Sequence, residues 1–237
     1  MVLRLLALTW MTPLMVVAVC ACGGGDDDGG ADGGDGGDDP CGFSSSDYLP
    51  YEVGFSWTFS KTDLGTGAKT SKGQALTEEM THPDYGQVIV QVTQKTGGET
   101  VSLLRRENDR VIRFEQEDRD SAQNLDRTTT YDPGQIRIDE SPERLAAGAE
   151  WDESYTEVKM DPQGVVLTTV PTTDHWKVLA VQEACSTAIG DFECVRVLKT
   201  RTQGGIAEKE FTFAPGVGKV REVGGNQLEE LTACSVQ

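Results

Sequence analysis

Apolar and polar residues alternate most regularly over residues 51–60, YEVGFSWTFS. Every second residue is apolar, and the residues between them are polar or glycine. A period of two places alternate side chains on opposite faces of an extended strand. The segment therefore predicts a strand with one buried face, which carries Tyr51, Val53, Phe55, Trp57 and Phe59.

Shorter segments with the same period follow along the chain. They occur in GQVIVQVTQ, RVIRFEQ, GQIRID, CVRVLK and EFTFA. Turn-forming pairs such as Gly97-Gly98, Asn108-Asp109 and Pro133-Gly134 separate them. Short strands with turns at this spacing predict one antiparallel all-β domain. We expect a curved sheet, a half-barrel or a sandwich of about ten strands.

One short helix is expected within ESPERLAAG. Ser141 can cap it, Pro142 suits the first helical position, and Gly148 can end it. The chain lacks the alternation of strands and helices that is typical of parallel sheets. The helix is therefore a minor addition to the all-β prediction.

The apolar pattern has a different meaning at the start of the chain. Arg4 precedes an apolar stretch that ends at Val19, which is short for a spanning helix of about 20 residues and typical of a signal peptide. The stretch ends in VCAC, which resembles the lipobox of bacterial lipoproteins. The resemblance implies that residues 1–21 are removed and that Cys22 is acylated, with Cys20 as the rival. An ordinary secretory signal is the alternative. Gly23 after the cysteine favours the outer membrane by the same resemblance.

Residues 23–40 contain nine Gly, seven Asp, one Ala and one Pro. A segment without large apolar side chains and with repelling charges predicts disorder. Its expected r.m.s. span is roughly 23 Å. We therefore expect a tether over residues 22–40 and a folded domain over 41–237. Calcium binding is the alternative, but the run has no Glu, which the EF-hand loop requires.

Net charge restricts the partners of the domain. The chain carries −18, and leaving out the seven Asp of the tether and Arg4 gives −12 for residues 41–237. So acidic a domain repels phosphate backbones. We expect no nucleic-acid partner.

Four cysteines remain in the expected domain: Cys41, Cys185, Cys194 and Cys234. An even number in an exported chain indicates disulfides. Cys185 and Cys194 flank a segment that can form a hairpin, and Cys41 and Cys234 lie near the two ends of the domain, which are often close together. We therefore expect these two pairings. A metal site is the alternative, but the chain has no CxxC and only two His.

Few residues point to catalysis. His82 lies in a turn-like segment and His175 near the start of an expected strand, and the chain has no GxSxG, SxxK or HExxH motif. We therefore expect no enzyme, no cofactor and no metal. The arginine-rich run at 103–127 allows an anion site or cross-strand charge pairs, of which the pairs are favoured.

Two motifs near the ends of the domain resemble a pattern in secreted bacterial proteins of unknown function, the TapB-like group and myxobacterial-type lipoproteins. The pattern is Y-x-P-x-x-x-G-x-x-W-x-[YF] early and [YF]-x-x-A-x-G-V-G-x-V late. Its residues here are Tyr48, Pro50, Gly54, Trp57, Phe59, Phe211, Ala214, Gly216, Val217, Gly218 and Val220. The resemblance implies a curved antiparallel sheet and no known activity.

Together these features predict a lipoprotein of the bacterial envelope, facing the periplasm or the cell surface and held to a membrane by acyl chains on Cys22. One apolar face on a curved sheet can wall a cavity, so we expect an apolar small molecule or lipid as ligand. Tyr51, Phe55, Trp57 and Phe59 are the expected ligand-facing residues. The alternative is a structural or protein-interaction component of the envelope without a small-molecule ligand.

Overall fold

The computed structural model describes residues 41–42, 45–203 and 207–236. All the described residues belong to one compact unit. The expected signal peptide, Cys22 and the whole expected tether lie outside the described residues. The boundaries expected for those segments stay predictions.

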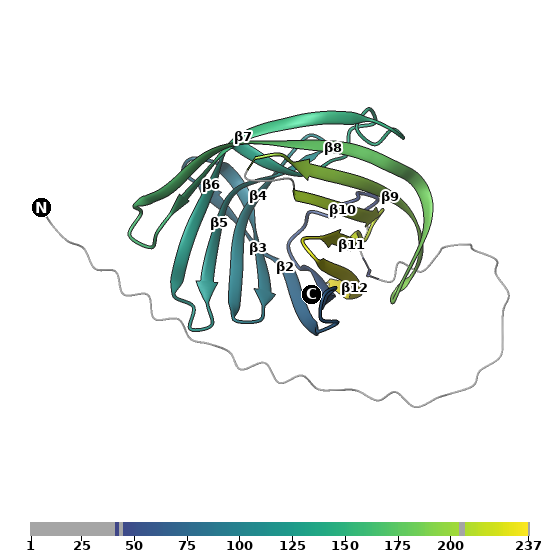
Figure 1. Ribbon diagram of the computed structural model, residues 1–237, viewed down its shortest axis with the longest axis horizontal. Helices are drawn as coiled ribbons and strands as arrows, with labels where there is room; N and C mark the ends of the chain where they lie inside the picture. The colour runs from purple at the N-terminus through teal and green to yellow at the C-terminus, as the bar shows by residue number, and fades with distance from the viewer. Residues whose placement is uncertain (1–40, 43–44, 204–206, 237) are drawn as a thin grey trace, which may run out of the picture. The chain divides into compact units, whose positions relative to one another are not determined.

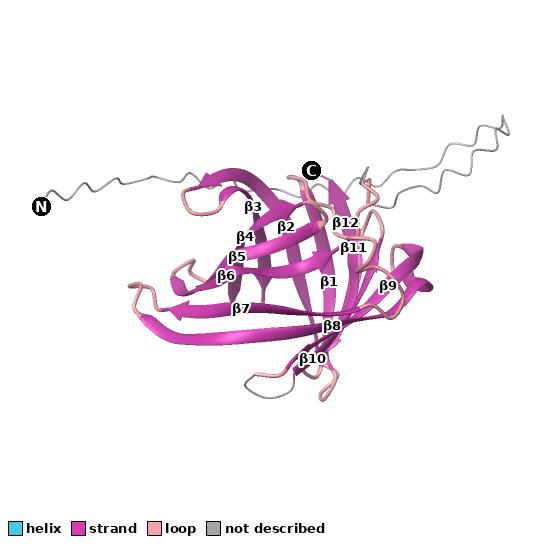
Figure 2. Ribbon diagram, turned by 90° about the horizontal axis from the view of Figure 1, so that it is seen from above, coloured by secondary structure: helices cyan, strands magenta, loops and turns pink. Residues whose placement is uncertain are grey.

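The described residues form twelve antiparallel strands (Figures 1 and 2). The strands are β1 Phe55–Asp63, β2 Lys69–His82, β3 Gly86–Lys95, β4 Gly98–Glu107, β5 Arg110–Asp120, β6 Leu125–Asp139, β7 Glu150–Met160, β8 Val166–Thr187, β9 Gly190–Arg201, β10 Ala207–Ala214, β11 Gly218–Gly224 and β12 Gln227–Val236. Each strand pairs with its neighbour in sequence, and β1 also pairs with β12. The sheet is therefore a closed up-and-down barrel.

The all-β antiparallel prediction is confirmed, but the expected half-barrel or sandwich of about ten strands is wrong. Pairing between β1 and β12 closes the sheet, with Phe55 opposite Val236 and Asp63 opposite Gln227. Closure removes both unpaired sheet edges, which a half-barrel would leave open. The strand number was underestimated because β2, KTSKGQALTEEMTH, has almost no apolar alternation.

The expected helix over 141–148 is also wrong, and this segment consists of turns. The hydroxyl of Ser141 donates to Asp139 (2.7 Å). The N–H of Gly148 donates to the carbonyl of Val178 in β8, and the N–H of Val178 donates to Ala149. These bonds to the neighbouring strand compete with helical bonds, so the segment joins β6 to β7 without a helix. No helix with the length and hydropathy to cross a bilayer occurs within the described part of the chain.

Inward-facing side chains change character along the strands. In β9, Val195 and Val197 belong to the apolar core, whereas Lys199 and Arg201 line a cavity. In β1, Phe59 belongs to the apolar core and Lys61, two residues further on, lines the cavity. One end of the barrel is therefore filled by apolar side chains, and the other end is polar and open.

The segment before β1 closes the apolar end. Tyr51 donates from its hydroxyl to the carbonyl of Leu104 (2.6 Å) and accepts from the N–H of Ile89 (3.2 Å). Tyr51 precedes β1, and Val53 is 45% exposed, so the buried stripe expected over 51–59 begins only at Phe55.

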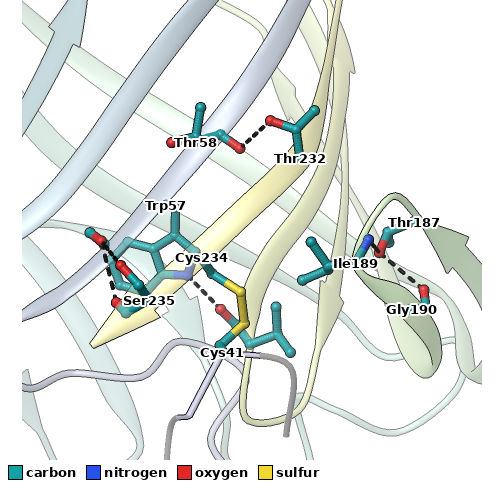
Figure 3. The surroundings of a disulfide bond; sticks show 11 residues. Cys41, Trp57, Thr58, Thr187, Ile189, Gly190, Thr232, Cys234 and Ser235 are labelled. Atoms are coloured by element: carbon teal, nitrogen blue, oxygen red, sulfur yellow. Dashed lines mark hydrogen bonds between the residues drawn. A yellow bond between two sulfur atoms is a disulfide. The ribbon is translucent and has the colours of Figure 1, made fainter. Parts of the chain in front are cut away.

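Both predicted disulfides are confirmed. Cys41 is bonded to Cys234 with their Cα atoms 5.0 Å apart, beside Trp57 (Figure 3). Cys185 is bonded to Cys194 across β8 and β9, with a Cα separation of 6.0 Å. The first bond ties the start of the described domain to its last strand, and chain-entropy arguments give it about 5 kcal/mol against about 2.7 kcal/mol for the short loop.

Candidate binding cavity

The polar end of the barrel contains a cavity of about 760 Å³. Its lining includes residues where hairpins turn, among them Asp63, Ala68, Thr96 and Gln227. These positions belong to the turns between β1 and β2, β3 and β4, and β11 and β12. The cavity therefore opens at the end of the barrel opposite the segment before β1.

Cations outnumber carboxylates in the lining. The nine cations are Lys61, Lys72, Lys95, Arg113, Arg137, Lys199, Arg201, Lys209 and Lys219. The four carboxylates are Asp63, Glu157, Glu222 and Glu229. Three more buried carboxylates, Asp118, Glu153 and Asp174, lie beside lining cations and lower the surplus from five positive charges to two. Arg127 and Lys159, which lie outside the lining, pair with Asp118 and Glu157 and raise it again.

One side of the cavity is an alternating chain of lysines and glutamates. Glu229 bonds Lys72 (2.6 Å) and Lys219 (2.9 Å), and Glu222 bonds Lys219 (2.5 Å) and Lys209 (2.7 Å). Burial, and then the charge of Lys219, lower the pKa of Lys72 to about 8. Burial would raise the pKa of Glu222, but the two lysines lower it well below its usual range. Charges on this side are largely compensated.

The neighbouring part of the wall, in β7, β8 and β9, is built around Asp174, whose side chain is fully buried. It accepts from Lys199 (2.5 Å), Arg201 (2.9 Å) and the hydroxyl of Tyr155 (2.8 Å). Burial lowers the pKa of Lys199 to about 8, although Asp174 and Glu153 oppose the shift. Lys199 therefore carries a desolvated charge at neutral pH.

Two guanidinium groups of the lining have no carboxylate partner among the described residues, those of Arg113 and Arg137. Arg113 donates to the side-chain oxygens of Gln116 (2.5 Å) and Gln135, and lies over the ring of Tyr131. Its Nε is buried and has no hydrogen-bond partner. Lys61 also has no carboxylate partner among the described residues. Asp63, two residues further along β1, lines the cavity too, and its negative charge offsets that of Lys61 in the charge count of the lining.

The expected ligand-facing residues lie elsewhere. Phe55, Trp57 and Phe59 are at most 4% exposed and belong to the apolar core. Tyr51 packs against that core, and none of the four lines the cavity. Continuing the period of two beyond Phe59 would have found Lys61, just as continuing Val195 and Val197 leads to Lys199 and Arg201.

The arginine-rich run is mostly compensated by ion pairs. Arg106 pairs with Asp47 (2.7 Å), Arg119 with Glu117 (2.5 Å), and Arg127 with Asp118 (2.6 Å). Arg105 and Arg110 both contact Glu107. Arg113 is the exception, because it lines the cavity and has only neutral partners.

Neither histidine lines this cavity. His175 contacts Asp152 (2.8 Å) on the barrel exterior, and His82 stacks on Tyr85. A second hollow of about 600 Å³ lies beside the β8–β9 hairpin, and its Arg196 is paired with Glu183. Within the described residues, no three His, Cys, Asp or Glu side chains are grouped to hold a metal.

Comparisons with known proteins give a fold and no family. No family model matches the chain, and a search of curated proteins found no significant match. A crystal structure described as an exported protein with a YmcC-like fold, from Bacteroides fragilis, matches with a TM-score of 0.52 at 14% identity, covering 80% of this chain and 99% of that one. A structure described as a lipoprotein from Parabacteroides distasonis matches with a TM-score of 0.48 at 13% identity, covering 81% and 99%. The chain therefore shares the fold of the Bacteroides fragilis protein.

Proposed function

We propose that this protein is a membrane-anchored binding protein whose barrel takes up a polar, anionic solute. Acyl chains on Cys22 hold it to a membrane of the bacterial envelope, and the segment at 23–40 connects them to the barrel. The outer membrane is the proposed site, with the barrel facing the periplasm or the cell surface.

The observation that carries this proposal is the sign of the charge inside the barrel. The lining has nine cations and four carboxylates, whereas residues 41–237 carry −12 in total. Low-dielectric walls of one sign focus the field and favour ions of the opposite sign. The electrostatic free energy of binding an anion is therefore more favourable inside this cavity than on the acidic exterior.

The same geometry argues against the apolar ligand expected from the sequence. The apolar half of the interior is filled by core side chains such as Phe59, Leu104 and Leu231, each 1% exposed. The open half is lined by lysine, arginine, glutamine and threonine. The proposed solute is therefore polar, and binding without catalysis is the proposed activity.

A second candidate, interaction with an envelope protein, has one observation in its favour. Val165, Val166 and Leu167 are 58%, 55% and 57% exposed at the turn between β7 and β8. This hairpin projects beyond its neighbours (Figure 2). An exposed apolar group of this kind is typical of interaction sites.

Native mass spectrometry of the full chain, extracted from its own membrane in a mild detergent, tests the binding function. We expect a bound anionic compound on the wild type and its loss from a Gln91→Trp variant, because Gln91 lines the cavity. Thr168→Trp, on the exposed part of β8, is the matched control and should keep the compound. Equal occupancy in all three proteins, or none in any, would contradict the proposal.

A further inference from the structure

The positive surplus of the cavity is concentrated on two arginines. Set against the nine lining cations, the four lining carboxylates and the three beside them leave two positive charges, and Arg127 and Lys159, which pair with Asp118 and Glu157 from outside the lining, add to this surplus. Arg113 and Arg137 are the guanidinium groups of the lining without a carboxylate partner among the described residues. The guanidinium of Arg137, in β6, also has no hydrogen-bond acceptor there, so its donors are available to a ligand.

The two arginines lie in adjacent strands of the same wall, because Arg113 in β5 pairs in register with Gln135, two residues before Arg137 in β6. Burial, and then the positive charge of Arg137, lower the pKa of Arg113 to about 10. Arg137 also contributes to lowering the pKa of Lys199. Arg137 therefore sits among like charges, an arrangement that costs free energy until an anion is bound.

Arg113 is already fixed in position. Gln116 and Gln135 accept from its two terminal nitrogens, the ring of Tyr131 lies under its guanidinium, and its Nε is left buried without a partner. The buried Nε is closed to a ligand, but each terminal nitrogen uses only one of its two N–H groups in these bonds. The side chain is therefore held in position in the lining with N–H donors left for a ligand.

We propose that Arg113 and Arg137 form a subsite for a phosphoryl group inside the barrel, an inference that rests on the proposed binding function. One carboxylate carries a single charge and is satisfied by one guanidinium fork. A phosphate monoester carries about −1.5 to −2 at pH 7 and offers three oxygens. A single phosphoryl group therefore compensates both arginines, and a single carboxylate does not.

Calorimetric titration of the full chain in detergent with inorganic phosphate tests the subsite. We expect one phosphate per chain and at least tenfold weaker binding by Arg113→Gln and by Arg137→Gln. Arg137→Lys, which keeps the charge but loses the fork, should retain part of the affinity. Arg110→Gln removes the same charge from the same strand outside the cavity lining and should stay within twofold of the wild type.

A phosphoryl group can belong to a soluble metabolite or to a lipid headgroup. Glycerol 3-phosphate and dihexanoyl phosphatidic acid share that group and differ in acyl chains, so their relative affinity identifies the source. Equal affinity indicates a soluble ester, and at least tenfold tighter binding of phosphatidic acid indicates a lipid. Either result supports the subsite, provided that Arg137→Gln weakens the binding of both compounds.

The subsite and the binding function fail in different ways. Unchanged phosphate affinity in Arg137→Gln, or a wild type that binds succinate but no phosphoryl compound, overturns the subsite and leaves the binding function intact. A wild type that binds no anion and carries no compound from its membrane overturns both. Unfolding midpoints of all variants show whether a lost affinity reflects lost folding.

Discussion

Gly216 illustrates how tightly the apolar end of the barrel is packed. Its φ is +73°, and a Cβ added there would lie 2.7 Å from the carbonyl oxygen of Ser45. Its N–H donates to the carbonyl of Asp47, and Trp57 donates from Nε1 to the carbonyl of Val217 (2.6 Å). The early and late motifs noted in the sequence therefore pack against each other, and their contacts close the apolar end of the barrel.

Gly216→Ala should lower the free energy of unfolding by roughly 2–4 kcal/mol, because left-handed backbone strain adds to an overpacked contact. Gly164→Ala is the matched control: its φ is +80° and its added Cβ meets nothing within 4 Å. It should lose only about 1 kcal/mol. Urea denaturation measures both, and equal losses would show that the contact with Ser45 has no energetic weight.

Lys199 predicts how anion binding depends on pH. Its pKa in the free protein is lowered to about 8 by burial, and Asp174, Glu153, Arg137 and the ring of Trp176 surround it. A bound anion favours the charged form and raises this pKa. Phosphate affinity should therefore fall as pH rises through 8, by about tenfold for a one-unit difference between bound and free pKa.

Titration calorimetry at pH 7, 8 and 9.5 measures this dependence. Lys199→Arg keeps a charge that does not titrate in this range, and its affinity should vary less with pH. Affinity of the wild type that is constant from pH 7 to 9.5 would show that Lys199 does not sense the ligand.

Residue identities in the sequence indicated the core well and the cavity poorly. Phe55, Trp57 and Phe59 were correctly placed on one buried face. The cavity was missed because inward-facing lysines and arginines look like solvent-facing residues until the strand is known to continue through them. Only closure of the sheet encloses those side chains.

At the scale of elements, a buried carboxylate from the segment between β6 and β7 helps to hold the segment before β1 in place. Glu140 accepts from the backbone N–H groups of Tyr48 (3.1 Å) and Leu49 (3.0 Å), and contacts Arg106 at 3.5 Å. Its side chain is 8% exposed, and burial raises its pKa although Arg106 opposes the shift. The carboxylate replaces the strand partner that this irregular segment lacks.

Glu140→Ala should destabilise the fold by about 3 kcal/mol, because it leaves two partly buried N–H groups without their acceptor and removes one of the two carboxylates that contact Arg106. Glu140→Gln keeps one acceptor oxygen and should lose about half as much. Urea unfolding of both variants checks the order. A change below about 0.5 kcal/mol for Glu140→Ala, the size of an ordinary surface substitution, would mean that other contacts hold the segment.

Element type was predictable where a strand has one apolar face, as in β1, β3 and β9. It was not predictable for β2, whose inward face is polar, nor for residues 141–148, where capping residues favour a helix. In that segment, the backbone hydrogen bonds that Gly148 and Ala149 form with Val178 outweigh the local preference for a helix. Such long-range pairing leaves no signal in a short window of sequence.

At the scale of the whole molecule, the sequence predicts the attachment and the structure describes the barrel. Cys22→Ser should release the protein from membranes into the soluble fraction, because acylation depends on that thiol. Cys20→Ser is the matched control and should remain membrane-bound. Fractionation and mass analysis of the mature N-terminus measure the result. Release by Cys20→Ser, with Cys22→Ser retained, would assign the lipid to the other cysteine.

The disulfide between Cys41 and Cys234 also determines how the barrel responds to mechanical force. A pull on the chain before Cys41 passes through the disulfide into β12 as well as along the backbone towards β1, so the segment before β1 does not carry the whole load. To withdraw β12, the force must break its hydrogen bonds to both β1 and β11. Tension from an anchored N-terminus is therefore shared between β12 and the segment that closes the apolar end of the barrel.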